Sequence, residues 1–397
     1  MEQAKIRVIH SFPVWLPQTQ TWMYNQVKYL PGEVEVHVVC ERTTNLDQFA
    51  IPNIHSLVEI SRLQYLWERL LRKVKMPRLL RFLQTTIRNL NAQIVHSHFG
   101  DTGWTNMDSV QRSGARHVVT FYGYDVGMLP ARHHKWLTRY RELFDQANLF
   151  LCEGPVMANR LIGLGCRPEK IRVHHLGVEV EKIEYRPRTW QKGEPLRILM
   201  AAGFREKKGF TYALKALSEF QHDVPIEITI IGDASSEPRS QQEKIRILNN
   251  IEDGNLKSIT TMLGFRSHAV FFEEAYKHHV FLSPSVTASD GDTEGGAPVS
   301  IIEMMATGMP VISTAHCDIP EVVSYGIPNW LVEERDVSGL VDRLNWLIEN
   351  WDRWDMFLKT GREHIEREFN AIRQGEQLAN YYSETLSGTQ ENREINL

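Results

Sequence analysis

The stretch Leu282–Thr314, LSPSVTASDGDTEGGAPVSIIEMMATGMPVIST, decides the fold of this chain. It predicts a short apolar strand, a polar loop rich in Asp and Gly, one helix and a second apolar strand. Pro298 suits the first position of the helix, and Gly308 with Pro310 ends it. A strand, a loop, a helix and a strand in this order are typical of a parallel α/β sheet.

The loop before this helix has the properties of an anion-binding site. A helix N-terminus carries roughly half a positive charge and unpaired amide groups, so it suits a phosphate. Glu294 lies in the loop, and Glu303 lies about a turn and a half into the helix, where it can face the same cleft. Taken alone, a Gly-rich loop before a helix can also be an ordinary connection.

The same residues carry a family resemblance. The segment resembles the donor-binding signature of glycosyltransferase family 4, retaining enzymes of the GT-B fold, and especially that of its exopolysaccharide (colanic-acid-type) members. In that family, two Glu residues separated by seven others contact the hydroxyls of the donor sugar and the ribose of the nucleotide. Here eight residues separate Glu294 from Glu303, so the loop holds one extra residue. The resemblance extends from about His10 to Tyr382.

Composition bounds the remaining alternatives. A chain of 397 residues predicts two domains, and the net charge of −4 gives no basic excess that would favour a nucleic-acid partner. Four widely separated cysteines without a CxxC pair indicate a reduced, cytoplasmic protein without a zinc site. No apolar run reaches the length of a signal peptide or a membrane span, so we expect any membrane association to be peripheral.

Two successive α/β series indicate where the domains lie. The polar segment Pro187–Pro195 has a proline at each end and is the predicted linker. The resemblance implies GT-B architecture with an acceptor-binding Rossmann-like domain (1–190), a donor-binding Rossmann-like domain (191–370) and a C-terminal helix returning to the first domain (371–397). The strands are expected at Lys5–His10, Val34–Cys40, Ile94–His98, His117–Phe121, Leu149–Cys152, Arg197–Ala201, Glu227–Ile231, Ser258–Leu263, Val280–Leu282 and Val311–Ser313.

A second loop, Ala201–Phe210 with the sequence AAGFREKKGF, follows the first strand of the second half. Gly203 lets the backbone approach a ligand, and Arg205 and Lys208 can neutralise a diphosphate. The loop is similar to the phosphate-binding loop of the family. Lys208 aligns with the lysine that precedes a glycine in that loop, whereas Arg205 is displaced from the usual Gly-Arg pair. Without that likeness, the charged run would be a solvated surface turn. We expect Lys208 to face solvent and to serve the diphosphate.

The resemblance assigns roles in the second half. It implies Arg205, Lys208 and Glu294 as catalytic residues. Because a helix terminus with two cations can stabilise the leaving diphosphate, we expect no metal at Asp290 and Asp292 and no cofactor besides the UDP- or GDP-sugar co-substrate. The implied donor-binding residues are Gly203, Gly264, Phe265, Gly295, Gly296, Ala297, Val299, Ser300 and Glu303.

In the first half, polar residues follow two predicted strands, where open α/β sheets bind ligands. The resemblance implies that His98, Tyr122 and Asp125 lie near the acceptor or the transferred sugar. Tyr122 stands where the family motif Thr-Phe-His-Gly has His, and a phenol is not the same proton carrier near neutral pH. His96 and His98 share a strand face and could hold a metal, but no third ligand is evident nearby.

These likenesses imply a metal-independent, retaining hexosyltransferase. It would transfer a sugar from a nucleotide sugar to a saccharide or lipid-linked saccharide, in the synthesis of a cell-surface polysaccharide or glycan. Front-face substitution is the implied mechanism, in which leaving diphosphate and acceptor share one side of the anomeric carbon. Two alternatives remain: a nucleotide-sugar hydrolase or epimerase, and a catalytically silent saccharide-binding protein.

The stretch Ser61–Leu90 holds eight Lys or Arg residues and one acidic residue among Leu, Trp and Phe. On a helix interrupted near Pro77, this pattern makes an apolar stripe with basic flanks. One interpretation is a helix that packs on the core and exposes its basic face. The other is peripheral docking to anionic lipid at the inner face of the cytoplasmic membrane, to which each basic residue contributes about 1 kcal/mol.

Overall fold

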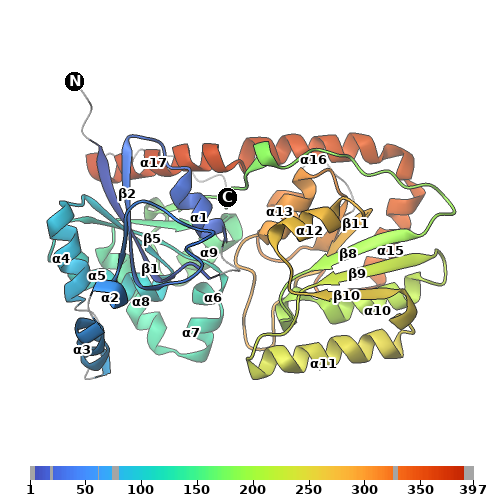
Figure 1. Cartoon of the computed structure of the whole chain (residues 1–397), viewed down its shortest axis with the longest axis horizontal. Coiled ribbons are helices and arrows are strands. Elements are labelled where there is room, and N and C mark those ends of the chain that lie inside the picture. The colour runs from blue at the N-terminus through green and yellow to red at the C-terminus, as the bar shows by residue number, and fades with distance from the viewer. Residues whose placement is uncertain (1–4, 18–20, 61, 74–79, 325–329, 389–397) are drawn as a thin grey trace. The chain divides into compact units, whose positions relative to one another are not determined.

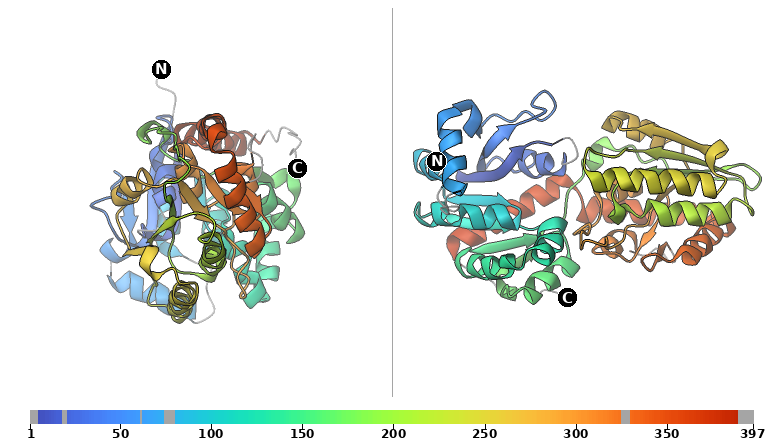
Figure 2. Two further views of the ribbon diagram at one scale, coloured as in Figure 1. Left: turned by 90° about the vertical axis from the view of Figure 1, so that its right-hand side faces the viewer. Right: turned by 90° about the horizontal axis from the view of Figure 1, so that it is seen from below.

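The computed structural model describes residues 5–17, 21–60, 62–73, 80–324 and 330–388. The predicted helix interruption near Pro77 therefore lies outside the described residues. The chain forms two units, Met1–Glu179 with Asn370–Leu397, and Val180–Phe369. Each unit is a parallel sheet with helices on both faces (Figures 1 and 2), which confirms the predicted doubly wound α/β class.

The first unit contains a seven-stranded sheet in the order β3-β2-β1-β4-β5-β6-β7. The strand order reverses between β1 and β4, where His10 pairs with His96 and Ser11 with Ser97. Open α/β sheets bind ligands at the carboxyl ends of the strands beside such a reversal. The strands are β1 (Ile6–Trp15), β2 (Val34–Thr43), β3 (Ile54–Ser56), β4 (Ile94–His98), β5 (Arg116–Thr120), β6 (Leu149–Cys152) and β7 (Ile171–Val173).

Helices cover both faces of this sheet because successive strand residues point to opposite sides. Val118 packs with Leu378 and Tyr382 of the C-terminal helix, whereas Val119 packs with Trp104 and Leu143 on the other face. The C-terminal helix thus belongs to the first unit. The helices are α1 (Thr21–Lys28), α2 (Leu57–Ile60), α3 (Arg62–Lys73), α4 (Arg81–Leu90), α5 (Gly100–Gln111), α6 (Gly123–Val126), α7 (Met128–Arg132), α8 (Lys135–Gln146), α9 (Pro155–Gly163) and α17 (Ala371–Ser387).

The second unit contains a six-stranded sheet in the order β10-β9-β8-β11-β12-β13. Its strand order reverses between β8 and β11, so the loops after these two strands meet. The strands are β8 (Leu196–Ala201), β9 (Ile226–Ile231), β10 (Thr260–Gly264), β11 (Val280–Ser283), β12 (Val311–Thr314) and β13 (Leu331–Val332). The helices are α10 (Phe210–Phe220), α11 (Pro238–Asp253), α12 (His268–Ala275), α13 (Val299–Ala306), α14 (Ile319–Val323), α15 (Val337–Glu349) and α16 (Trp354–Glu368).

The differences from the sequence prediction are local. The short strands β3, β7 and β13 were not predicted, because two or three residues carry no readable alternation. Helix α13 begins at Val299, with Pro298 as its N-cap. The predicted linker Pro187–Pro195 lies within the second unit, where the buried Arg188 guanidinium donates to the carbonyls of Thr307, Ala275 and His278.

Within the described part of the chain, no helix combines the length and the apolar character needed to cross a bilayer.

Candidate functional site

In the second unit, the two loops that the sequence singled out pack against each other. The amide of Val286 donates to the carbonyl of Lys207 at 2.8 Å. Gly209 has a φ of +68°, and a Cβ atom there would lie 1.8 Å from the carbonyl oxygen of Pro284. Glycine is therefore required at this position for the close approach of the loops. The contact fixes the cations after β8 beside the carboxylates after β11.

Glu294 is the buried centre of this site. Its carboxylate is 2.8 Å from Nζ of Lys208, 4.0 Å from Nζ of Lys207, and accepts from Oγ of Ser285 at 2.9 Å. Burial alone would raise the pKa of Glu294, but the two ammonium groups outweigh it and lower the pKa to about 2. The Lys208 side chain is only 21% exposed, so it is less solvent-facing than predicted, because it pairs with Glu294.

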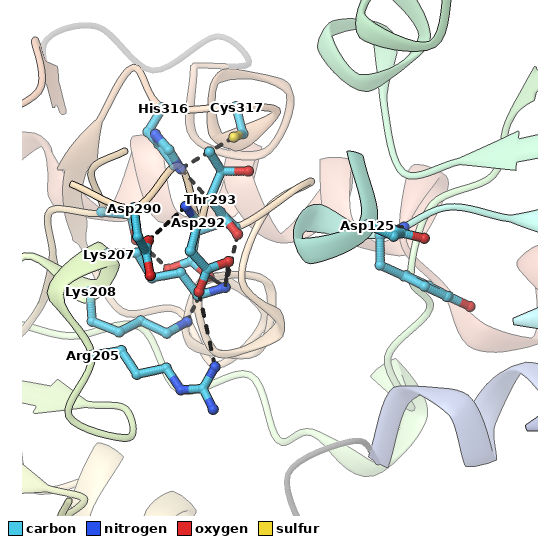
Figure 3. Close-up of polar contacts among 12 residues, drawn as sticks. Asp125, Arg205, Lys207, Lys208, Asp290, Asp292, Thr293, His316 and Cys317 are labelled. Carbon is cyan, nitrogen blue, oxygen red and sulfur yellow. Dashed lines mark hydrogen bonds and ion pairs between the residues drawn. The ribbon is translucent and has the colours of Figure 1, made fainter. Parts of the chain in front are cut away.

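The neighbouring aspartates hold cations as well (Figure 3). Lys207 contacts Asp292 at 3.2 Å, and Arg205 lies 4.0 Å from the same carboxylate. Asp290 pairs with Arg239 of α11. Each aspartate therefore has a protein cation as its partner, and the half-exposed Arg205 remains accessible to an anion. The loop places Arg205, Lys207 and Lys208 together with counter-charges that an incoming phosphate can replace.

The start of α13 supplies further donors. No side chain caps this helix, so the first-turn amides of Val299 and Ser300 have no intrahelical acceptor. They follow Gly295, whose φ is +87°, the buried Gly296 and the half-buried Ala297. Such a terminus, reached through glycines, can bind an anionic oxygen.

Glu303 lies on α13 and is buried, and its carboxylate accepts from Nε2 of His268 at 2.7 Å. Gly264, with a φ of +69°, and the exposed Phe265 precede α12, which carries His268. A Cβ atom on Gly203 would meet no atom within 4 Å, so the backbone there borders open space. These residues come from the ends of three strands of the same sheet, β8, β10 and β11.

Sequence reasoning missed three residues that complete this site. Lys207 lay within the quoted charged run but was not nominated. His268 and His316 follow β10 and β12 and gave no sequence signal. Nε2 of His316 accepts the amide of Glu294 at 3.2 Å, and its Nδ1 contacts Glu334 at 2.6 Å. These bonds fix the backbone of the loop that holds one extra residue.

In the first unit, the expectation that no third ligand lies near His96 and His98 was wrong. His10 joins them, because β1 and β4 are neighbours and His10 pairs with His96 across the sheet. Ring nitrogens of the three lie within 4.8 Å of one another, which is metal-ligand spacing. Every one of these nitrogens nevertheless has a protein partner.

The partners form one continuous chain of hydrogen bonds. It runs from Thr120 to His96 (2.6 Å), Tyr382 (2.7 Å), His10 (3.1 Å), His98 (3.0 Å), Tyr122 (2.7 Å) and Gln26 (3.2 Å). Because Tyr122 donates its proton to Gln26, it must accept from Nδ1–H of His98, and each earlier bond then points the same way. Burial lowers the pKa of His10 to about 3 and the pKa values of His96 and His98 well below 6.5, so the rings are uncharged.

The predicted sugar-proximal residues are brought together by this chain and its neighbour Asp125. The carboxylate of Asp125 accepts the amides of Tyr122 at 2.8 Å and Gly100 at 2.7 Å. Burial raises the pKa of Asp125, and these two amides oppose that rise. His98, Tyr122 and Asp125 are all buried. Gln26, at the end of the chain of hydrogen bonds, is buried as well, and its Nε2 has no hydrogen-bond partner.

A cleft of about 230 Å³ lies at the carboxyl end of the same sheet. Phe12, Leu57 and Phe82 give it an apolar wall, and Glu41 and Asp101 are among its polar lining residues. A pocket with an apolar wall and a few polar groups is typical of a small-ligand site.

Comparisons with protein families match both halves of the chain. Residues 19–182 match a model described as Glycosyltransferase Family 4, and residues 195–350 match one described as Glycosyl transferases group 1. The chain is 34% identical over 295 residues to the putative colanic acid biosynthesis glycosyltransferase WcaL of Salmonella typhimurium, covering 72% of this chain and 70% of WcaL. It is 32% identical over 284 residues to the amylovoran biosynthesis glycosyltransferase AmsK of Erwinia amylovora, covering 70% and 67%.

Comparisons with solved structures bear on the fold. HepE of Anabaena, solved in complex with UDP and glucose, superposes with a TM-score of 0.74 at 16% identity, covering 95% of this chain and 99% of HepE. Sucrose-phosphate synthase of Thermosynechococcus elongatus gives 0.74 at 18% identity, covering 97% and 100%. These likenesses confirm the predicted GT-B architecture.

Proposed function

The chain belongs to glycosyltransferase family 4, and from this premise we propose that it is a retaining glycosyltransferase with a nucleotide-sugar donor site in its second unit. We infer further that it acts in exopolysaccharide synthesis, as the names of its relatives WcaL and AmsK state for those proteins. The observation that carries the proposal is the buried Glu294 held by Lys208, beside the uncapped start of α13.

The proposed roles follow from the charges of this site. Lys208, Arg205 and the amides of Gly295 to Ser300, apart from Pro298, stabilise the negative charge that develops on the leaving diphosphate. Glu303 holds the ribose of the nucleotide. Glu294, ionised because its pKa is about 2, accepts hydrogen bonds from the hydroxyls of the donor sugar. Lys207 orders the loop through Asp292 and adds positive charge.

Transfer proceeds with retention in this proposal. The acceptor hydroxyl attacks the anomeric carbon from the side on which the diphosphate departs, and its proton passes to the departing phosphate oxygen. No enzyme carboxylate needs to attack. The Lys208–Glu294 pair supports this role, because a carboxylate whose charge is neutralised by a lysine is a weak nucleophile.

Metal independence is part of the proposal. Asp290 and Asp292, the carboxylates that could have held Mg²⁺, are paired with Arg239 and Lys207. Cations of the protein therefore occupy the electrostatic role that a divalent metal fills elsewhere. A UDP- or GDP-sugar is the proposed donor, and UDP is supported by its presence in the HepE structure.

For the acceptor, we propose a saccharide, free or lipid-linked, bound by the first unit. Its site would be the 230 Å³ cleft lined by Phe12, Leu57 and Asp101. Because a lipid-linked acceptor stays in the membrane, we propose that the enzyme works as a peripheral protein at the cytoplasmic face. We propose no nucleic-acid partner.

Product analysis tests this function against its alternatives. Wild-type protein is incubated with UDP- or GDP-sugars, with and without a membrane extract that contains lipid-linked saccharides. A glycosyltransferase releases nucleoside diphosphate in proportion to acceptor, and proton NMR of the product shows the anomeric configuration of the donor. Release without acceptor would instead indicate a hydrolase, a converted donor an epimerase, and no release a saccharide-binding protein.

A further inference from the structure

The basic stretch from residue 61 to residue 90 contains helices α3 and α4, and the apolar residues of one are buried whereas those of the other are exposed. Helix α4 packs Phe82, Leu83 and Ile87 into the core of the first unit. Helix α3 exposes its apolar residues instead: Leu63 is 77% exposed, Leu66 59%, Trp67 63% and Leu70 52%. The core-packing interpretation is therefore correct for α4, whereas these four apolar residues of α3 do not pack on the core.

The four exposed side chains form one surface, which we call the α3 arc (Leu63, Leu66, Trp67 and Leu70). At 3.6 residues per turn they fall within about 100° of the helix circumference. Tyr65 projects from the opposite side and packs against the core cluster of β1, β2 and α4. The fold therefore holds α3 by one face and presents the arc outward, and α3 projects from its unit in Figure 1.

The stretch of sequence that contains the α3 arc is basic. The sequence from residue 61 to residue 90 holds eight Lys or Arg residues against one acidic residue, and Arg62, Arg81 and Arg88 are exposed. An exposed apolar arc with a Trp and basic neighbours matches the headgroup region of an anionic bilayer, where Trp is favoured and Arg meets lipid phosphate.

We propose that the α3 arc docks the protein onto a membrane surface that contains anionic lipid. The proposal rests on the proposed function in one respect, since it assigns a lipid-linked saccharide to the cleft. Along the chain, α3 lies between Leu57 and Leu80, and both of these residues line the cleft. Docking through the arc brings the cleft to the membrane surface, where the carrier lipid holds the acceptor.

Vesicle co-sedimentation tests the docking. Wild-type protein should bind vesicles of phosphatidylcholine with phosphatidylglycerol at least about tenfold more tightly than vesicles of phosphatidylcholine alone, and high salt should weaken the binding. The variant Leu63→Gln/Leu66→Gln/Trp67→Gln/Leu70→Gln should lose about tenfold or more in affinity. These side chains are exposed, so their replacement leaves the core unchanged.

The matched control is Ile245→Gln/Leu248→Gln, which removes two exposed apolar side chains from α11 of the second unit. This variant should bind vesicles as the wild type does. Wild-type protein that ignores anionic vesicles at low salt overturns the proposal, and so does an α3 variant that still binds them fully. A dimer in analytical ultracentrifugation that only the α3 variant loses, without vesicle binding, would make the arc a self-association surface and also overturn it.

Thermal stabilisation by nucleotide sugars is measured in the same variants, so that failure of the docking and failure of the proposed function are distinguishable. If a nucleotide sugar stabilises the protein but vesicles do not bind, only the docking proposal is contradicted. If vesicles bind but no nucleotide sugar stabilises the protein, the proposed donor site is contradicted and the docking surface is supported.

Discussion

The buried polar cluster of the first unit is uncharged, whereas that of the second unit is held together by full charges. In the first unit, His10, His98 and Tyr382 satisfy one another by hydrogen bonds. In the second, Lys208 balances the ionised Glu294. A neutral network maintains a shape, because its imidazole rings and hydroxyl groups satisfy one another. A balanced charge pair at a loop can exchange partners when a diphosphate arrives, so only the second cluster is suited to bind an anion.

This comparison predicts that acid acts on the two clusters in different pH ranges. The buried His10 has a pKa of about 3 instead of 6.5, so the unfolded chain binds a proton that the folded unit excludes. The first unit should therefore lose stability as the pH falls below 6.5, by about 2 kcal/mol for each such histidine at pH 5. Glu294 has its pKa lowered from 4.5 to about 2, so its contribution is complete above pH 4.5 and is lost only as the pH falls from there towards 2.

Hydrogen exchange at pH 7 and pH 5, corrected for intrinsic rates, measures this difference. Opening free energies of β1, β4 and β5 should fall most between the two pH values, because the buried His10, His96, His98 and His117 lie on these strands. Those of β8 and β11 should fall less, since the histidines of lowered pKa beside them are His278 and His279. Equal losses in both units would contradict the contrast between a neutral and a charged cluster.

The charged cluster can be broken by Lys208→Ala. We expect turnover to fall about 10²- to 10³-fold, since one preorganised contact to the developing charge is removed. The unfolding temperature should also fall, because the buried Glu294 loses its nearest cation. Steady-state kinetics with a thermal melt measures both effects.

Lys277→Ala is the control for this variant, because Lys277 pairs with Glu274 at a similar distance of 2.7 Å on the exposed surface of the same unit. It should change neither quantity appreciably. Wild-type turnover in folded Lys208→Ala protein would remove Lys208 from the proposed mechanism.

The neutral cluster can be broken by Tyr382→Phe. The lost hydroxyl leaves Nε2 of His10 and Nδ1 of His96 without partners in the core, which should cost about 1 to 3 kcal/mol of unfolding free energy. The neighbouring Tyr381→Phe removes a hydroxyl that donates to Val173 nearer the surface, and should cost less. Urea denaturation compares the two, and equal stability of Tyr382→Phe and wild type would mean that the network is not a stabilising unit.

A smaller effect is expected from Glu303→Gln, which keeps the shape and removes the charge beside His268. Affinity for the nucleoside diphosphate should fall about tenfold, as expected when a charged hydrogen-bond acceptor becomes neutral. Isothermal titration with UDP and GDP measures it, with Glu349→Gln on the exposed surface of α15 as the control. An unchanged affinity in Glu303→Gln would contradict the ribose assignment.

The two clusters also differ in how far the sequence predicts them. Arg205, Lys208 and Glu294 lie in two contiguous stretches that each follow a predicted strand, so their meeting followed from the strand order of a doubly wound sheet. His10, His96 and Tyr382 are far apart in the chain, and only the register of β1 with β4 and the return of α17 brings them together. The positions of His268 and His316 depend on loop contacts, to Glu303 and to Glu294 with Glu334, that no sequence pattern encodes.

The apolar pattern of the basic stretch shows a further limit. Helices α3 and α4 have the same amphipathic spacing, and periodicity finds the apolar face of each helix. It does not tell whether that face meets the core, as Phe82 does, or solvent, as Trp67 does. That outcome depends on which side of the helix the rest of the unit occupies.

The central claim, that the charged cluster of the second unit binds a nucleotide sugar, is tested most directly by thermal unfolding of wild-type protein and Lys208→Ala with a panel of nucleotide sugars. We predict that one UDP- or GDP-sugar, and its nucleoside diphosphate, raises the unfolding temperature of the wild type, because a ligand bound to the native state stabilises it. The same ligand should raise that of Lys208→Ala much less. If no nucleotide sugar or nucleoside diphosphate stabilises the wild-type protein, the claim is contradicted.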